Sequence, residues 1–305
     1  MELAKGKELM GGLVDTQGAC YGDRELLGQL ASGALIAQSR RHAVRKQILA
    51  GLSYHERKWL RAAAIGLGTS KAVLTGRSAA RMLGMWVVAA TPEHVELTLP
   101  SGFSPPKAEW AEGTKFYRGK LERTEIFHYP ELPGIEFTGP VRTAFDIAIR
   151  HGFTEGLVAF DWLLASRRAT RAELKQAVAL MRGKKGVAVL REVLRYAVHN
   201  SQSPFESYAR VLLIQAGMTE VATQVPVGPY SGDLGLGMLI IEVDGEEKYD
   251  GKTYAPLDIT LRKERKREVY LQNRGYTVRR VDPMALLRNP DGFIEMVREA
   301  LSHLA

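Results

Sequence analysis

The pattern of apolar and polar positions divides the chain into three regions that differ in the elements they predict. The first, roughly residues 1–56, contains DRELLGQLASGALIAQ, in which leucines recur at the spacing of one helix face. Asp23 suits a helix N-cap, and Gly33 suits the end of that helix. The residues expected on its buried face are Leu26, Leu27 and Leu30.

A basic segment, SRRHAVRKQ, follows this predicted helix. A small helical unit followed by basic residues is what a winged-helix protein offers to DNA. The alternative is the solvated basic face of an ordinary helix, because no clean helix-turn-helix pattern precedes the basic run. On the first interpretation, a degenerate winged-helix-like region would contact nucleic acid through Arg40, Arg41, Arg45 and Lys46.

The second region, roughly residues 57–200, mixes helix and strand patterns. Helices are predicted in RKWLRAAAIGLG, LTGRSAARMLGM, PVRTAFDIAIRHG, LVAFDWLLASR and RAELKQAVALM, with Thr75 as an N-cap and Pro140 at a helix start. HVELTLP alternates apolar and polar residues and predicts a half-buried strand, and KFYRGKL and RTEIFHY predict two more strands. Four histidines have no metal-ligand spacing and are expected to be surface or capping residues: His94, His128, His151 and His199.

The third region, roughly residues 201–305, has a pattern of its own. SPFESYARVLLIQAG predicts a helix with Ser203 as its N-cap and Gly217 at its end. TQVPVG predicts a short strand, and GDLGLGMLIIEVDG predicts either two strands around a tight glycine turn or one long bent strand. A strongly basic helix, LRKERKREVYLQNRGY, a last strand, TVRRVD, and a C-terminal helix follow. We therefore expect a mixed α/β chain in which this region is a small α/β domain with its own core.

Two carboxylates of this region point to metal chemistry, because Asp233 opens the glycine-containing segment and Glu242 ends the apolar run. In a hairpin they would be neighbours on one edge of the sheet, where they repel unless a cation lies between them. Mg²⁺ (or Mn²⁺) suits such a site, since Mg²⁺ takes one or two protein carboxylates together with water and phosphate oxygens. The backbone carbonyl of Val243 is a further candidate ligand. The alternative is an acidic turn without a metal.

Other charged residues of the region fit the same site. Lys248 is close enough in sequence to hold a phosphate or to position the attacking water. Glu206, on the preceding helix, could reach the metal or its water shell, or could serve only as a capping-box residue. The basic helix suits contacts with a phosphate backbone through Arg262, Lys263, Arg265, Lys266 and Arg267.

The overall charge supports a polyanionic partner. The 305-residue chain has a formal net charge of +8 and a pI of about 9.5, which favours nucleic acid, here DNA, over the alternative of a basic enzyme without such a partner. The single cysteine, Cys20, excludes a disulfide framework and a cysteine-rich zinc site and fits a reducing cytoplasm. No run of about 18 apolar residues and no signal-peptide core occurs, so we expect no membrane partner. No small-molecule cofactor is indicated, and the oligomeric state stays open, a homodimer included.

The third region resembles the very-short-patch-repair-like endonuclease domains, a branch of the PD-(D/E)xK nuclease superfamily, through SPFES, GDLGL, IEVDGEEKY and KERKREVYLQNRGYTVRRV. The resemblance implies a restriction-endonuclease-like core with Asp233 and Glu242 as metal ligands and Lys248 as the catalytic lysine. It also implies that Glu206 and Asp244 support them. The lysine position of the superfamily's short E-x-K is occupied by Asp244, and no histidine lies near the motif.

The first two regions resemble actinobacterial proteins that join an AbiEi-type antitoxin module to such a nuclease-like domain. VLTGRSAARMLGM, HVELTLP and GPVRTAFDIA carry this resemblance. The module is similar to a degenerate winged helix followed by an α/β domain. It implies DNA binding and a link to toxin–antitoxin or phage-defence systems.

Three functional hypotheses follow. The first is a metal-dependent DNA endonuclease that acts in DNA repair or phage defence. The second is an antitoxin-like DNA-binding regulator whose nuclease fold does not cut. The third is an interaction module whose acidic loop is only structural.

Overall fold

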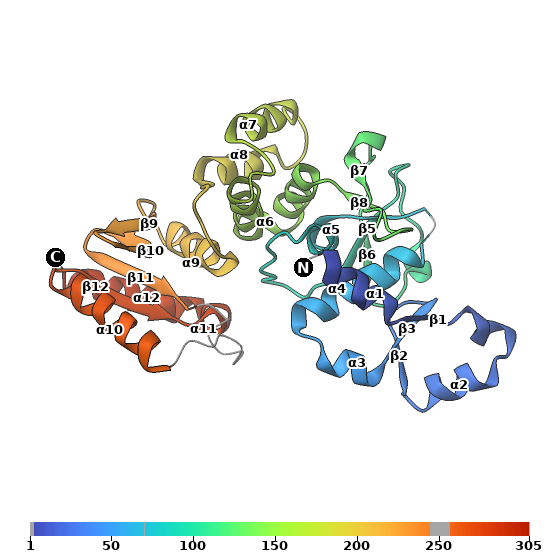
Figure 1. Cartoon of the computed structure of the whole chain (residues 1–305). Helices are drawn as coiled ribbons and strands as arrows, with labels where there is room; N and C mark the ends of the chain where they lie inside the picture. Colours follow the sequence, from blue (N-terminus) through green and yellow to red (C-terminus); the bar gives the residue numbers. More distant parts are fainter. Residues whose placement is uncertain (1–2, 70, 245–256, 305) are drawn as a thin grey trace.

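The computed structural model describes residues 3–69, 71–244 and 257–304 (Figure 1). The chain is of mixed α/β class, as the pattern predicts, with sheets of three, five and four strands. Within the described ranges, no helix has the length and apolar character needed to cross a membrane.

The N-terminal elements build a small antiparallel sheet in the order β1-β3-β2. Its elements and the helix that follows are α1 (Leu3–Gly11), β1 (Leu13–Asp15), the 3-10 helix η1 (Gln17–Tyr21), α2 (Arg24–Ala31), β2 (Leu35–Ala37), β3 (His42–Arg45) and α3 (Lys46–Gly51).

Helix α2 begins and ends as the sequence predicts. The Asp23 carboxylate accepts a hydrogen bond of 3.1 Å from the amide of Leu26, and Gly33 follows the helix with a left-handed φ of +73°. Residues beyond Gly33 form strand β2, which pairs with the basic segment as a hairpin. The prediction that the three leucines share a buried face is wrong for Leu27, which is exposed, because α2 is short and packs through Leu26.

The second sheet has five strands in the order β6-β5-β4-β8-β7. The elements of this part are α4 (Tyr54–Leu67), β4 (Val73–Leu74), α5 (Gly76–Leu83), β5 (Val95–Thr98), η2 (Lys107–Glu109), β6 (Thr114–Phe116), η3 (Arg123–Glu125), β7 (Ile126–Phe127) and β8 (Phe137–Thr138). Strand β5 is not half-buried, as its alternation predicts, but fully buried. It has a strand on each side and contacts α5, so Glu96 and Thr98 are enclosed with the apolar residues.

Three helices follow: α6 (Pro140–Ala165), α7 (Arg171–Leu180) and α8 (Val187–Tyr196). Gly152 interrupts α6 with φ +82° and ψ −169°, a conformation open essentially to glycine alone. The sequence PVRTAFDIAIRHG therefore ends one helical half, and LVAFDWLLASR lies in the next, as the pattern predicts.

The last sheet has the order β12-β11-β10-β9, with β12 parallel to β11 and the other pairs antiparallel. Its elements are α9 (Pro204–Gln215), β9 (Ala222–Val227), β10 (Tyr230–Leu236), β11 (Leu239–Val243), α10 (Leu257–Gln272), β12 (Thr277–Val281), α11 (Pro283–Arg288) and α12 (Pro290–Ser302). Of the two interpretations left open for residues 232–245, the hairpin is correct, because Leu236 pairs with Leu239 around Gly237, whose φ is +59°.

Helix α9 belongs to two hydrophobic cores. Val211 lies in the core of α5–α8, whereas Leu213 lies in the core of the last sheet, which also includes Val158 of α6. A buried ion pair of 2.7 Å between Arg210 of α9 and Asp161 of α6 joins the same helices. The predicted regions 57–200 and 201–305 therefore share packing, and their division into separate domains stays a prediction.

Candidate functional site

The β10–β11 hairpin brings Asp233 and Glu242 to neighbouring positions. Leu234 pairs with Ile241, and the same register places Asp233 opposite Glu242. Side chains directly opposite each other in an antiparallel pair lie on one face of the sheet. The Asp233 carboxylate accepts a hydrogen bond of 2.9 Å from the amide of Val243, the residue after Glu242.

Glu242 is buried and forms ion pairs with arginines from two elements. Its carboxylate lies 2.7 Å from Nη2 of Arg267 on α10 and 3.5 Å from Nε of Arg280, its partner in the parallel β11–β12 register. Arg267 also donates to the carbonyl of Ser231 at 2.6 Å, which fixes it across the end of the hairpin. Arginine cations therefore do part of what the sequence argument assigned to a metal ion.

Glu206 adds a third carboxylate near this edge. Its amide donates to Oγ of Ser203, the predicted cap, at 3.1 Å, while its own carboxylate accepts from the amide of Gln202 and the side chain of Gln224, both at 3.0 Å. The expected capping-box bond to the amide of Ser203 is thus replaced by one to Gln202. Burial raises the pKa of Glu206, and the negative charge of Asp233 raises it further, against the opposing hydrogen bond from Gln202.

The remaining residues predicted for this site are placed only in part. The amide of Asp244 donates to the carbonyl of Val281 at 3.0 Å and prolongs the β11–β12 pairing. Lys248 lies outside the described residues, and so do the side chains of Arg262 and Lys263. Two further basic side chains of α10 are exposed: Arg265 and Lys266.

The oxygen donors are of the chemical type that a small divalent cation takes. In an extended strand the N–H and C=O of one residue point to the same side, so the Val243 carbonyl faces β10 as its amide does. Two carboxylates and one carbonyl are hard oxygen ligands of the kind that Mg²⁺ takes together with water. Among the described residues, no three His, Cys, Asp or Glu side chains are grouped to hold a metal, so water or phosphate would have to complete the shell.

The basic residues predicted near the N-terminus lie at one hairpin. Arg40 and Arg41 occupy the turn between β2 and β3, Arg45 ends β3, and Lys46 begins α3; all four are exposed. Arg41 forms an ion pair of 3.1 Å with Asp15 of β1, and Arg40 donates to the carbonyl of Glu109 at 3.1 Å. No hydrogen bond or ion pair between described residues joins them to the C-terminal carboxylates.

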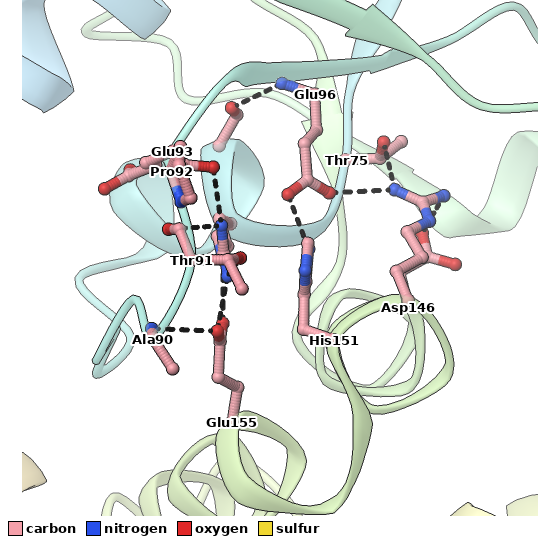
Figure 2. Close-up of polar contacts among 12 residues, drawn as sticks. Thr75, Ala90, Thr91, Pro92, Glu93, Glu96, Asp146, His151 and Glu155 are labelled. Carbon is pink, nitrogen blue, oxygen red and sulfur yellow. Dashed lines mark hydrogen bonds and ion pairs between the residues drawn. The ribbon is translucent and has the colours of Figure 1, made fainter.

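A second polar cluster, which the sequence argument missed, lies in the middle of the chain (Figure 2). It brings together charged residues from α5, β5 and α6, the elements formed by VLTGRSAARMLGM, HVELTLP and GPVRTAFDIAIRHG. His151 is not the surface or capping residue expected, because its Nε2 lies 2.7 Å from Oε1 of Glu96 and its side chain is 10% exposed. The available signal was charge inside apolar segments, such as Glu96 within HVELTLP, rather than any linear spacing.

Comparison with known proteins adds little to this geometry. No family model matches the chain. The chain is similar to the uncharacterized proteins MT2308 and Rv2248 of Mycobacterium tuberculosis, from strains CDC 1551 / Oshkosh and ATCC 25618 / H37Rv, with 33% identity over 97 residues in each case. The match covers 32% of this chain and 36% of each relative, so the chain spans little more than a third of the curated relatives it matches.

Proposed function

We propose that the chain is a metal-dependent DNA endonuclease that hydrolyses phosphodiester bonds at the end of the β10–β11 hairpin. The observation that carries the proposal is the placement of Asp233 opposite Glu242, with Glu206 within electrostatic reach. The element order α9-β9-β10-β11-α10-β12, with a parallel last pair, supports assigning this part to the restriction-endonuclease-like core of the very-short-patch-repair-like type.

In this proposal, Asp233, Glu242 and the Val243 carbonyl would hold Mg²⁺ or Mn²⁺. The bound ion supplies an acidified water and stabilises charge on the phosphate. Burial raises the pKa of Glu206, and a carboxyl with a raised pKa suits proton exchange beside the reacting phosphate. The exposed side chains of Arg265 and Lys266 would hold the DNA backbone, and Lys248 and Asp244 keep the roles that the resemblance implies.

The N-terminal part would dock the duplex. The order α1-β1-η1-α2-β2-β3 and the sheet order β1-β3-β2 support a degenerate winged helix, with α2 as the helix before the wing. The turn of the β2–β3 hairpin presents Arg40 and Arg41 where a wing would contact the phosphate backbone. This arrangement is also what an AbiEi-type antitoxin module would use.

One observation favours the alternative function, an antitoxin-like DNA-binding regulator that does not cut. Glu242 is held by Arg267 at 2.7 Å and by Arg280 at 3.5 Å, so its charge is balanced without a metal. A site maintained only for folding and DNA contact would be expected to look like this.

A plasmid-nicking assay with Mg²⁺ or Mn²⁺ tests the two functions on the full chain. The endonuclease should nick, and Asp233→Asn and Glu242→Gln should each abolish nicking while retaining DNA binding. The matched controls Asp291→Asn and Glu295→Gln, both exposed on α12, should keep full activity. Binding with a steep salt dependence but no nicking by the unmodified chain would favour the regulator. If the unmodified chain neither binds nor nicks DNA, the hypothesis of an interaction module is favoured.

A further inference from the structure

A small polar pocket opens between β5, β6 and the first half of α6. Its volume is about 370 Å³, and the residues that matter for its chemistry are His94, Glu96, Lys115, Tyr117, Arg150 and His151. None of these residues belongs to the C-terminal carboxylate site, so this pocket is independent of the proposed endonuclease function.

The wall of the pocket is a chain of buried ion pairs. Glu96 is bound at both oxygens: Oε2 lies 3.2 Å from Nη1 of Arg150, and Oε1 lies 2.7 Å from Nε2 of His151 (Figure 2). Nη2 of Arg150 continues the chain to Asp146 at 3.1 Å. Because its oxygens are engaged, Glu96 does not present an unmatched negative charge to the pocket.

Beside this chain, Arg77 is bound through Nε to Glu155 at 2.7 Å. Asp146 is also bound to Arg142, at 3.2 Å. Each of the three buried carboxylates therefore has a cationic partner: Arg150 for Glu96, Arg77 for Glu155, and Arg150 and Arg142 for Asp146, with Arg142 shared with Glu125 at 2.8 Å. No buried carboxylate of this group thus faces the pocket without a cationic partner.

The exposed rim then adds positive charge. Lys115 is exposed and forms no ion pair with any described residue. Its Nζ lies 5.0 Å from the centre of the Tyr117 ring, and the guanidinium carbon of Arg150 lies 4.0 Å from the centre of the same ring. The ring of His94 makes no hydrogen bond within the described part of the chain. The mouth of the pocket is therefore cationic and has donors to offer a ligand.

The local backbone is shaped around this wall. Gly76 begins α5 with a left-handed φ of +52°, and a Cβ built there would collide with Oε2 of Glu96 and come within 3.1 Å of Nη1 of Arg150. Buried charges are costly to maintain and are weak evidence of stabilisation. Clusters of them beside a cleft are more often found at functional sites.

We propose that this pocket binds a phosphate monoester with a small organic body. Lys115 and His94 hold the phosphate at the mouth, beside the wall formed by Glu96, Arg150 and His151. A volume near the lower end of small-molecule sites, about 300–1,000 Å³, leaves room beyond the phosphate. The phosphate is carried either by a free nucleotide or by the 5′ end of a DNA strand.

Titration calorimetry on the full chain tests the proposal, with adenosine 5′-monophosphate as ligand and adenosine as the control without phosphate. The nucleotide should bind and adenosine should not. Lys115→Ala and His94→Ala should each weaken binding by about tenfold or more, the loss of one charge-assisted hydrogen bond. Lys71→Ala and His128→Ala change residues that are also exposed but lie outside the pocket, and should leave the affinity unchanged.

A second arm identifies the source of the phosphate. It compares a short oligonucleotide with and without a 5′-phosphate, in the unmodified chain and in Lys115→Ala. A preference for the phosphorylated end that disappears in Lys115→Ala assigns the pocket to DNA ends, whereas binding of the mononucleotide alone assigns it to a free nucleotide. Absence of phosphate-dependent binding in both arms, or equal losses in the Lys71 and His128 variants, would overturn the proposal. Loss of plasmid nicking would not bear on it.

Discussion

Glu96 and Glu242 are both buried and paired with arginine, and the two sites differ in how far the cationic partners are enclosed. At Glu96 the partners Arg150 and His151 are 9% and 10% exposed, whereas at Glu242 the partners Arg267 and Arg280 are 27% and 39% exposed. The first is an enclosed unit whose cations are held mainly by buried carboxylates. The second leaves cations within reach of solvent, and so of a polyanion. The same pairing therefore occurs in two settings that differ in how easily solvent reaches the cations.

The largest effect is expected at the Arg77–Glu155 pair, which lies beside the enclosed Glu96 site. Arg77→Met should lower the free energy of unfolding by about 3–5 kcal/mol, because it leaves Glu155 buried without its cation. The two side chains are 1% and 2% exposed, so solvent cannot compensate. Denaturant unfolding measures the loss. The double variant Arg77→Met/Glu155→Leu should recover most of it, since an apolar pair carries no unmatched charge, and a single-variant loss below about 1 kcal/mol would contradict the enclosure.

Gly76→Ala should follow in size. The left-handed φ costs an alanine roughly 1–3 kcal/mol, and the collision with Glu96 adds to that cost. Gly33→Ala is the matched control, because Gly33 has a φ of +73° but no atom within 4 Å of the position that a Cβ would occupy. The difference between the two variants in denaturant unfolding isolates the steric demand of the Glu96 carboxylate. Equal losses of unfolding free energy in the two variants would show that the Glu96 side chain can shift to make room for the new Cβ.

Arg267→Met should cost less than Arg77→Met, roughly 1 kcal/mol or below, because the Arg267–Glu242 pair is partly exposed. If Arg267 also serves DNA, the same variant should reduce the salt dependence of DNA binding by about one phosphate contact. Fluorescence anisotropy across a salt series measures that slope, with Glu295→Gln, exposed on α12, as the variant expected to leave it unchanged. If Arg267→Met lowers the free energy of unfolding as much as Arg77→Met does, the difference in exposure between the two ion pairs does not set their contribution to stability.

The smallest effect concerns pH. The pKa of Glu206 is raised in the folded chain by burial and by Asp233, so the folded state keeps its proton while the unfolded state has lost it. Stability should therefore fall as pH rises from about 4 toward 7, and Glu206→Gln should remove that part of the fall. Urea unfolding of both chains at several pH values measures the difference. A difference that is constant with pH, or that grows in favour of the unmodified chain, would contradict the raised pKa.

Much of the C-terminal sheet could be predicted from local signals. Ser203, Gly217 and Gly237 mark a cap, a stop and a turn, and each acts through its own backbone neighbourhood. The pairing of Asp233 with Glu242 followed from the hairpin, because a two-residue turn fixes which residues face each other. The arginines that bind Glu242 could not be predicted in the same way, since Arg280 reaches it through a parallel pairing and Arg267 through the packing of α10.

The middle cluster escaped prediction for a related reason. Glu96 and His151 are 55 residues apart, and Arg77 and Glu155 are 78 apart, so no local spacing joins them. The alternation of HVELTLP suggested that one face of the strand meets water, but that face meets α5 and α6 instead. A polar residue in an alternating strand signals only that it needs a polar partner, and the fold decides whether the partner is water or protein.

The second half of α6 is tied at two points: Glu155 reaches back to Arg77, and Asp161 reaches forward to Arg210 and to Ser207 at 2.8 Å. A fragment that starts at residue 201 would lack Asp161, the ion-pair partner of Arg210. It would also lack Val158, which belongs to the same hydrophobic core as Tyr208 and Leu213. Shortening the protein to its last third would thus remove part of the core and the ion pair that α6 and α9 share. The proposed nuclease activity should therefore be assayed in the intact chain.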